Sequence, residues 1–535
     1  MRTWFFAASA ASLALVALAA QLAPQLLWLY AVLGPIVLLG VYDALQTKRA
    51  VLRNFPVIGH FRYLFEMIRP EIKQYFIESN TDGRPFSREL RSVVYQRAKR
   101  QRDTVPFGTQ RDVYEVGYEW LDHSMTARHV HEVPRVRLGE GRCEHPYDAA
   151  LLNISAMSFG SLSANAVRAL NGGAERGGFF HNTGEGGVSP YHLEPGGDLC
   201  WQLGTGYFGC RRPDGTFDPA QFEEKARLPQ VKLIEVKLSQ GAKPGHGGIL
   251  PAAKVTPEIA AIRGVPTGQD VLSPPHHSAF STPRGLLEFV QQLRDLCQKP
   301  VGVKLCVGDR AEFLGVCMAM VETGIVPDFV AVDGGEGGTG AAPLEFSNSI
   351  GAPLTEGLVF VHNALQGFGV REQVKVIASG RVVTGFQMAQ RLAAGADLCG
   401  SARGFMFSLG CIQALRCNSN DCPVGVATQQ PGLAAGLVVP HKTERVASWQ
   451  QQTVKAFLET IGAAGLERPD QLRPWHIHRR VSPTETRTYD EIYDYLAPGQ
   501  LLGADAPPGW RRWLDQASPE RFRLAADEAA DPAGR

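Results

Sequence analysis

Eight short runs that are rich in β-branched and small apolar residues follow one another from residue 150 onward, and helical stretches separate them. Most of the runs are followed by a loop that contains glycine. Strands that alternate with helices in this way predict an α/β fold, the (β/α)8 or TIM barrel, with its chemistry at the ends of the strands. The predicted strands are Leu151–Ile154, Phe179–Asn182, Leu233–Leu238, Asp270–Leu272, Val301–Leu305, Asp328–Val332, Val374–Ala378 and Ala396–Cys399.

Four regions are predicted along the chain. They are a transmembrane helical hairpin over 1–43, a juxtamembrane basic helical region over 44–149, the barrel over 150–440, and a C-terminal helical extension over 441–535. The longest interruption of the barrel pattern covers residues 190–228. It is too long for a simple loop, so we expect it to form an excursion over the barrel mouth.

The N-terminal hairpin is predicted from two nearly uncharged apolar runs, Trp4–Ala20 and Leu26–Tyr42, with Pro24 between them. Each run is long enough to span a bilayer. Arg2 precedes the runs and Lys48, Arg49 and Arg53 follow them, so the positive-inside rule places both ends, and the catalytic domain, in the cytoplasm. A signal peptide and a buried helix pair are the alternatives.

The charge of the chain as a whole is unremarkable, at +1 for 535 residues with 44% hydrophobic residues. The length and the hydrophobic content indicate a large globular core, and the near-zero net charge excludes nucleic acid as a partner. One basic stretch stands out, and it ends in Lys99, Arg100 and Arg102. This stretch suits membrane lipid or an acidic electron donor, and a solvated helix face is an equal alternative.

Three of the ten cysteines, Cys411, Cys417 and Cys422, share one loop with the spacing Cys-x5-Cys-x4-Cys, and Pro423 follows the last of them. Thiolates grouped in this way before a proline are typical of iron–sulfur loops. Three ligands predict a cluster with three irons, 3Fe-4S. The alternative is that the three residues are small buried apolar side chains.

Several motifs occur in an order that resembles the FMN-binding synthase domain of the glutamate synthase family, over about residues 150–430. Together they are much more specific than any single glycine-rich piece. The motifs are Met157-Ser-Phe-Gly-Ser-Leu-Ser163, Asn182-Thr-Gly-Glu-Gly-Gly187, Gln240-Gly-Ala-Lys-Pro-Gly-His-Gly-Gly248, Ser273-Pro-Pro-His-His277, Gly337-Gly-Thr-Gly340 and the cysteine loop through Gln429.

A site for the FMN phosphate is expected after the last two strands, where small residues let backbone N–H groups approach an anion. Lys304 lies in an otherwise apolar strand, so it is expected to face an anionic partner rather than to reach solvent, and the resemblance makes that partner the flavin ring. The predicted cofactor-binding residues are Met157, Ser158, Gln240, Lys304, Ser379, Gly380, Arg381, Gly400, Ser401 and Ala402.

The resemblance also implies a site for the keto acid 2-oxoglutarate, with Gln240, Lys243, Arg263 and Ser158 as binding residues. Lys243 and Glu185 are the predicted catalytic residues, Glu185 as a carboxylate that takes a proton from ammonium. A helix cap is the alternative role for Glu185, and an ordinary surface position is the alternative for Arg263. His276 and His277 follow a predicted strand, and a buried, hydrogen-bonded role is expected for a histidine there.

The family resemblance implies an oxidoreductase that acts on CH–NH2 donors. Ammonia condenses with 2-oxoglutarate to 2-iminoglutarate, which hydride from reduced FMN converts to L-glutamate. Electrons are expected from an external donor such as ferredoxin or a reductase subunit, through the cluster. The first cysteine is Cys143, so no glutaminase domain with an N-terminal cysteine is expected, and a separate glutaminase subunit is a possible partner.

Four positions depart from the family pattern. Asp333 and Glu336 replace a Ser and an Asp, Ile249 replaces a glutamine near the substrate, and Asn165 replaces a glutamate. These changes leave two alternatives open. One is an enzyme that makes N-methylglutamate from methylamine and glutamate, and the other is a non-catalytic, membrane-tethered flavin redox sensor.

Overall fold

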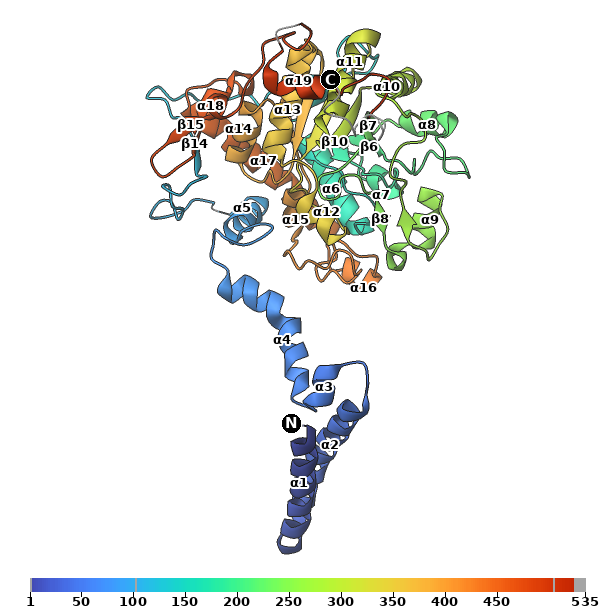
Figure 1. Ribbon diagram of the computed structural model, residues 1–535, viewed down its shortest axis with the longest axis vertical. Helices are drawn as coiled ribbons and strands as arrows, with labels where there is room; N and C mark the ends of the chain where they lie inside the picture. Colours follow the sequence, from blue (N-terminus) through green and yellow to red (C-terminus); the bar gives the residue numbers. More distant parts are fainter. Residues whose placement is uncertain (1, 102, 504–505, 524–535) are drawn as a thin grey trace, which may run out of the picture. The chain divides into compact units, whose positions relative to one another are not determined.

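The computed structural model describes residues 2–101, 103–503 and 506–523, and the chain divides into two compact units at the bond between Arg88 and Glu89. The first unit is helical (Figure 1). Its elements are α1 (Arg2–Leu22), the 3-10 helix η1 (Pro24–Leu29), α2 (Tyr30–Leu45), α3 (Ala50–Asn54), α4 (Gly59–Ile72) and the π-helical turn η2 (Lys73–Ile77).

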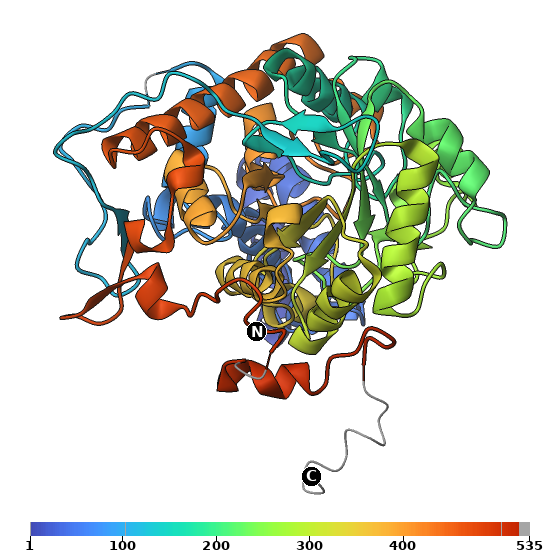
Figure 2. The same ribbon diagram turned by 90° about the horizontal axis from the view of Figure 1, so that it is seen from above.

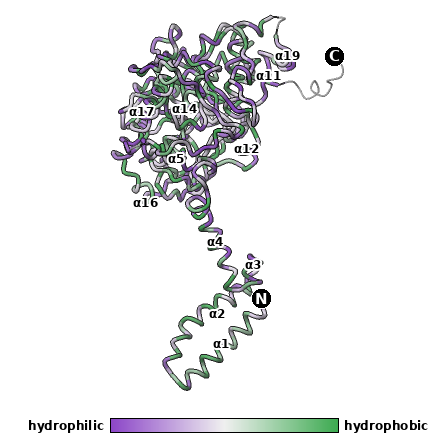
Figure 3. The backbone as a smooth tube through the Cα atoms, turned by 90° about the vertical axis from the view of Figure 1, so that its left-hand side faces the viewer, coloured by the Kyte–Doolittle hydropathy of each residue, from purple (hydrophilic) through white to green (hydrophobic). Residues whose placement is uncertain are grey.

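Helices α1 and α2 form an antiparallel hairpin. The Tyr30 hydroxyl donates to the Leu13 carbonyl at 2.8 Å, and the Phe5 ring lies where a side chain on Gly40 would stand. Two helical segments, Arg2–Leu22 and Pro24–Leu45, are long and apolar enough to cross a membrane. Apolar residues run along both (Figure 3), and many are exposed, such as Leu22 at 92% and Trp28 at 80%.

The second unit is built around a closed barrel of eight parallel strands, which confirms the predicted (β/α)8 fold. The last strand pairs with the first, with Cys399 beside Leu152, so the sheet has no open edge. The strands, in order, are β4 (Leu152–Ile154), β5 (His181–Asn182), β6 (Leu199–Leu203), β7 (Val231–Lys237), β10 (Val301–Cys306), β11 (Phe329–Asp333), β12 (Lys375–Ser379) and β13 (Leu398–Ser401).

Helices connect the strands and surround them (Figure 2). Polar residues start several of them, as where Ser163 accepts from the Ala166 N–H and Asp309 from the Ala311 N–H. These helices are α6 (Ala164–Gly177), α7 (Pro190–Leu193), α8 (Pro219–Ala226), α9 (Pro257–Arg263), α10 (Pro283–Cys297), α11 (Arg310–Thr323), α12 (Leu344–Ser349), α13 (Leu354–Gly367), α14 (Gly385–Ala393), α15 (Arg403–Leu409) and α16 (Pro431–Ala434).

One predicted strand was wrong and one real strand was missed. Val271–Leu272 forms β9, which pairs antiparallel with β8 (Ile249–Leu250) in a two-stranded ribbon outside the barrel. The third barrel strand is β6, inside the stretch 190–228 that was expected to be a mouth excursion. Its sequence Leu-Cys-Trp-Gln-Leu has no β-branched residue, so it lacks the composition that marked the other strands.

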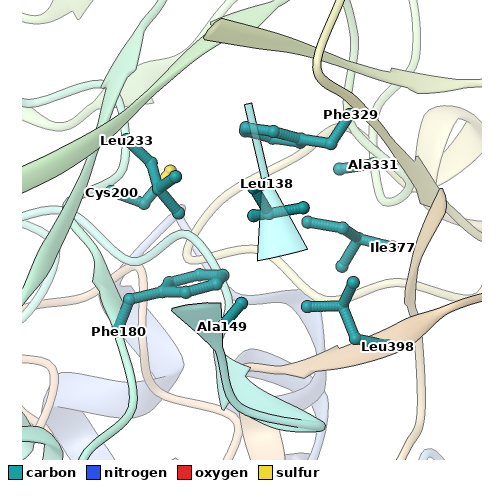
Figure 4. Packing of buried hydrophobic residues seen from close by; sticks show 9 residues of the cluster. All are labelled: Leu138, Ala149, Phe180, Cys200, Leu233, Phe329, Ala331, Ile377 and Leu398. Carbon is teal, nitrogen blue, oxygen red and sulfur yellow. The ribbon is translucent and has the colours of Figure 1, made fainter. Parts of the chain in front are cut away.

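A β-hairpin packs against residues at the amino ends of the barrel strands. It consists of β2 (Val136–Leu138) and β3 (Tyr147–Ala149). Leu138 is fully buried and lies among side chains from several strands, as Figure 4 shows. The cluster comprises Leu138, Ala149, Phe180, Cys200, Leu233, Phe329, Ala331, Ile377 and Leu398. This apolar cluster leaves the opposite, carboxyl end of the barrel for polar residues.

The segments that flank the barrel pack on its outside. Helix α17 (Val439–Ala463) packs on α6 and α14, and β1 (Glu119–Leu121) pairs with β14 (Ile477–Arg480), which pairs with β15 (Thr486–Thr488). The remaining elements are α5 (Arg88–Ala98), α18 (Tyr489–Ile492), α19 (Pro508–Leu514) and the 3-10 turns η3 (Ala252–Lys254), η4 (Arg371–Gln373), η5 (Pro469–Gln471) and η6 (Pro474–His476).

Candidate active site

Charged side chains gather at the carboxyl ends of the barrel strands. Lys237 at the end of β7 and Lys304 on β10 are register partners on neighbouring strands. Each is buried and each has a carboxylate partner: Lys237 Nζ lies 3.0 Å from Glu185, and Lys304 Nζ lies 3.4 Å from Asp333. The barrel mouth therefore holds buried charges as close pairs, which reduces the cost of removing them from water.

Glu185 follows β5 and fits between two glycines. A Cβ on Gly204 would stand 2.7 Å from one carboxylate oxygen, and a Cβ on Gly248 would stand 2.0 Å from the other. Burial raises the pKa of Glu185, but Lys237, Arg263 and Lys243 outweigh it and lower the pKa below 4.5. Glu185 is thus an ionised carboxylate held in a fixed position.

Lys243 is buried beside this pair. Its Nζ donates to the Ala341 carbonyl at 2.8 Å. Burial lowers the pKa of Lys243 from 10.5 to about 8; Glu185 opposes this shift and Lys237 adds to it. Lys243 therefore titrates close to neutral pH, as groups at active sites often do.

Arg263, at the end of α9, is buried and reaches the loop after β4. One guanidinium nitrogen donates to Ser158 Oγ at 3.3 Å and to the Phe159 carbonyl at 3.1 Å, and the group lies 5.2 Å from the Phe208 ring centre. Burial lowers the pKa of Arg263 to about 10 although Glu185 raises it, and its Nε has no hydrogen-bond partner among the described residues. The fold thus brings together Ser158, Glu185 and Arg263, three residues that were predicted separately.

A small cavity of about 20 Å³ lies beside Glu185 and Lys237, and Thr205, Ser239 and His246 also line it. A volume of this size holds a molecule as small as water. Its polar lining provides hydrogen-bond donors and acceptors for such a molecule.

A polar network fills the barrel interior below the mouth. The buried carboxylate of Glu235 accepts from Asn182 at 2.9 Å and from Gln202 at 2.5 Å. Burial lowers the pKa of Lys304, but Asp333 and then Glu235 outweigh it and raise the pKa above 10.5. Lys304 thus has a carboxylate partner within this chain, Asp333, and its contact with a flavin ring stays a prediction.

Lys237 and Glu235 were not among the predicted site residues. Both lie in the predicted strand Leu233–Leu238, where a charged residue between apolar ones carries the same signal that identified Lys304. The rule applied to Lys304 would have found them. Gln202 was out of reach because its strand was not recognised.

The predicted phosphate residues lie together at the ends of β12 and β13. The hydroxyls of Ser379 and Ser155 are 2.9 Å apart, and Ser401 Oγ donates to the Val382 carbonyl at 2.6 Å. Arg381 has a left-handed backbone with φ of 53°. Burial, and then the positive charge of Arg381, lower the pKa of Arg403 to about 10 although Glu336 and Asp333 oppose this shift, and Arg403 donates to the Glu336 carbonyl at 2.7 Å.

This donor set fits a phosphate group. Two guanidinium groups repel each other, and an anion bound between them offsets this repulsion. Gly380, Gly400 and Ala402 are the small residues of these two turns, as a backbone that approaches an anion requires. The other predicted flavin residues lie nearby in the chain's fold: Met157 is buried with its N–H on the Asn182 carbonyl at 3.5 Å, and Gln240 is half-buried directly before Gly241, whose N–H donates to Asp333.

The positions that depart from the family pattern have different surroundings. Asp333 pairs with Lys304, and Glu336 accepts from the Leu354 N–H at 3.0 Å, so both hold the loop after β11. Asn165 donates to the carbonyls of Ala434 and Leu437, at the outer segment α16. Ile249 is half-buried in β8, directly after Gly248.

The two adjacent histidines differ in burial. His276 is exposed, whereas His277 is buried between the Tyr207 hydroxyl and the Lys237 carbonyl, each 2.9 Å from a ring nitrogen. Burial lowers the pKa of His277 to about 4, so it is neutral at physiological pH. His277 therefore has the buried, hydrogen-bonded role that the sequence predicted, next to the backbone of Lys237.

The cysteine loop is held by hydrogen bonds to its backbone. The Tyr95 hydroxyl donates to the Cys411 carbonyl at 2.6 Å, and the buried Lys254 amine donates to the carbonyls of Cys417 at 2.7 Å and Ala427 at 2.9 Å. Burial raises the pKa of Cys411 to about 12, and the thiols of Cys417 and Cys422 add to this effect.

The thiols of Cys411, Cys417 and Cys422 do not converge as a ready ligand set. In the part of the chain that the structure describes, no group of three His, Cys, Asp or Glu side chains is close enough to hold a metal ion. Three soft ligands in one loop suit iron, but their sulfurs must move together to hold it. The iron–sulfur cluster therefore stays a prediction.

Comparison with known proteins identifies the family. The conserved region in glutamate synthase matches residues 127–467. The glutamate synthase large subunit-like protein YerD of Bacillus subtilis (strain 168) is 38% identical over 488 residues, which cover 83% of this chain and 93% of that protein. The archaeal glutamate synthase (NADPH) of Methanocaldococcus jannaschii is 35% identical over 324 residues, 60% of each protein.

Similar solved structures include flavocytochrome b2 with sulfite bound, with a TM-score of 0.43 and 13% identity over 85% of this chain and 96% of that one. Mandelate oxidase with benzoylformic acid has a TM-score of 0.40 and 14% identity over 69% of this chain and 86% of that one. The family match spans the barrel, and YerD is aligned with 83% of this chain. The chain therefore belongs to the glutamate synthase family.

Proposed function

We propose that this chain reductively aminates 2-oxoglutarate with ammonia to L-glutamate at the barrel mouth. The observation that carries the proposal is the group of Glu185, Lys237, Lys243 and Arg263, one ionised carboxylate among three buried cations. A dicarboxylate keto acid needs such cations to bind, and an amine needs a nearby base. Membership of the glutamate synthase family supports the same reaction.

Each residue of the group has a proposed role. Arg263 and Lys243 bind the carboxylates of 2-oxoglutarate, with Ser158 and Gln240 beside them. Glu185 takes a proton from ammonium, and Lys237 keeps Glu185 ionised. The cavity of about 20 Å³ beside Glu185 and Lys237 has the size for ammonia.

FMN is the proposed cofactor, and when bound it supplies the hydride. Its phosphate would lie at Ser379–Arg381 and Gly400–Ala402, with Arg403 beside them. Lys304, together with Met157, Ser158 and Gln240, would face the ring. Electrons would come from an external donor such as ferredoxin or a reductase subunit, and ammonia from solution or from a separate glutaminase subunit.

The experiment starts with anaerobic, detergent-solubilised protein whose flavin is photoreduced. Reoxidation is followed by absorbance after 2-oxoglutarate and ammonium are added, and glutamate is measured at the end. Rapid reoxidation with stoichiometric glutamate is expected. Glu185→Gln, which keeps the shape but not the charge, should retain flavin and lose most of this reaction. Flavin that stays reduced in the wild-type protein contradicts the proposal and favours a redox sensor.

A second candidate reaction is the formation of N-methylglutamate from methylamine and glutamate. It is favoured by Ile249, an apolar residue next to Gly248, whose backbone adjoins Glu185. An apolar side chain there suits a methylated amine better than ammonium. The same protein assayed with methylamine and glutamate distinguishes the two reactions by the amino acid product.

A membrane location completes the proposal. The two apolar helices, Arg2–Leu22 and Pro24–Leu45, would form a hairpin anchor, with both ends and the catalytic unit in the cytoplasm.

A further inference from the structure

A second cavity, of about 340 Å³, lies outside the barrel mouth, among the ends of three helices. Lys99 and Arg100 line it from the end of α5, and Arg176 from the end of α6. His441, Glu444, Arg445 and Ser448 line it from α17, where their spacing places them on one helix face. The cavity is therefore a built feature of three elements, and a volume of this size suits a small molecule.

The charge in this cavity is unbalanced. Among the described residues that line it, Glu444 is the one carboxylate, against four permanent cations. Glu444 lies 3.3 Å from Arg176. In the described part of the chain, Lys99, Arg100 and Arg445 form no ion pair, and the buried Nε of Arg445 has no hydrogen-bond partner. The cations that line the cavity thus outnumber its carboxylate, and an anionic ligand would offset the excess positive charge.

Two further features increase the positive potential. Lys442 lies close to Arg445 and Lys99; burial first, and then these two cations, lower its pKa below 10.5. Helix α17 begins with no acidic residue in its first turn and no side-chain cap, so the positive end of its dipole is not offset. None of these groups belongs to the proposed active site.

We propose that this cavity, formed by Lys99, Arg100, Arg176 and Arg445, binds a ligand with a phosphate group. Guanidinium groups match the oxygens of phosphate with paired hydrogen bonds, and here they converge from different helices. A phosphorylated metabolite and a phospholipid headgroup share this chemistry. The inference does not depend on the reaction at the barrel mouth.

The test uses the full-length protein in nanodiscs of phosphatidylcholine, with pyrophosphate as the probe in a calorimetric titration. Binding is expected, and it should weaken as salt is added. Arg100→Gln and Arg445→Gln should each weaken it by about tenfold, the loss of a charged hydrogen bond. Lys455→Gln, an exposed α17 lysine paired with Glu459, is the matched control and should not change it.

Arg100 is exposed, so Arg100→Gln tests the site even if Arg445→Gln fails to fold. The absence of pyrophosphate binding, or equal binding by wild-type and Arg100→Gln protein, would overturn the proposal. The titration is then repeated in nanodiscs that contain phosphatidylglycerol. Pyrophosphate binding that the anionic lipid suppresses in the wild-type protein assigns the site to a headgroup, and unchanged binding assigns it to a soluble phosphate compound.

Discussion

Glu185 illustrates how single residues determine the chemistry of this barrel mouth. Burial disfavours its charge, yet Lys237 at 3.0 Å keeps it ionised, and a side chain on Gly204 or Gly248 would clash with its carboxylate. The lowered pKa has a thermodynamic consequence. The pair stabilises the fold above the unfolded-state pKa of about 4.5, and this contribution is lost as pH falls through the lower folded-state pKa.

Lys243 is a cation whose pKa is also lowered, and this shift predicts how activity depends on pH. Its folded-state pKa is about 8, against the ordinary value of 10.5 for a lysine, and the charged form is the one that binds a carboxylate. We expect kcat/KM for 2-oxoglutarate to fall as pH rises through about 8. In Lys243→Arg this fall of kcat/KM should occur at higher pH, because arginine stays charged. A fall of kcat/KM at the same pH in the variant would assign the pH dependence to another group.

The same shift of Lys243 predicts how stability changes. Between pH 8 and 10.5 the unfolded chain holds the proton that the folded protein has lost, so this group makes unfolding less favourable as pH rises through that window. Chemical denaturation of wild-type and Lys243→Met protein at both ends of the window isolates the effect. The free energy of unfolding should rise more steeply with pH in the wild-type protein than in Lys243→Met. Equal slopes in the two proteins would assign the effect to another group.

The cysteine loop gives a prediction on composition. Cys417→Ser should lose iron and keep FMN, because a hydroxyl is a poor ligand for iron and the flavin residues lie on other loops. Iron and flavin are measured in the same anaerobic preparation. Cys143→Ser is the control, since Cys143 is half-buried and outside the loop. Full iron content in Cys417→Ser would exclude Cys417 as a ligand.

At the scale of elements, the hairpin of β2 and β3 supports the amino end of the barrel. Leu138→Ala removes a fully buried side chain from the cluster of Figure 4. We expect a loss of about 2–5 kcal/mol in the free energy of unfolding, from lost burial and the cavity left behind. Urea denaturation measures it. Leu502→Ala, at a position 57% exposed, should change it by less than about 0.5 kcal/mol.

The sequence predicted seven of the eight barrel strands, because buried parallel strands have a distinctive apolar, β-branched composition. It failed for β6, whose Cys200 and Gln202 resemble a loop, and it accepted β9, whose Val271 and Leu272 imitate a short strand. Composition alone does not distinguish a barrel strand from a ribbon, since the difference lies in the pairing partner.

The site shows the same limit. Motifs located Glu185, Lys243, Arg263 and Lys304, but not the pairing of Lys237 with Glu185 or of Lys304 with Asp333. Each pair joins residues far apart along the chain, and strand pairing within the barrel brings them together: β10 pairs with β11, and β6 lies between β5 and β7. The basic stretch that ends in Lys99 and Arg100 was recognised, whereas its partner Arg445 is about 345 positions away along the chain and was not.

At the scale of the whole molecule, the two units have different surfaces. The first carries exposed apolar residues on both long helices, such as Trp4 at 75% and Leu38 at 70%, whereas the second has a buried apolar core around the barrel. Exposed apolar helices of this length are stable in lipid, not in water. We therefore predict that the first unit, which ends at Arg88, holds the protein at the membrane.

We expect full-length protein to stay with the membrane pellet after alkaline carbonate extraction. A chain that begins at Glu89 should appear in the supernatant and keep its flavin, because the barrel and its flanking helices lie in the second unit. A signal peptide, the rival explanation, predicts a shortened N-terminus in the mature protein, which mass spectrometry of the intact chain detects. Uncleaved protein that leaves the membrane in carbonate would instead show that the two helices do not span it, since peripheral contacts are released by this treatment whereas spanning helices are retained.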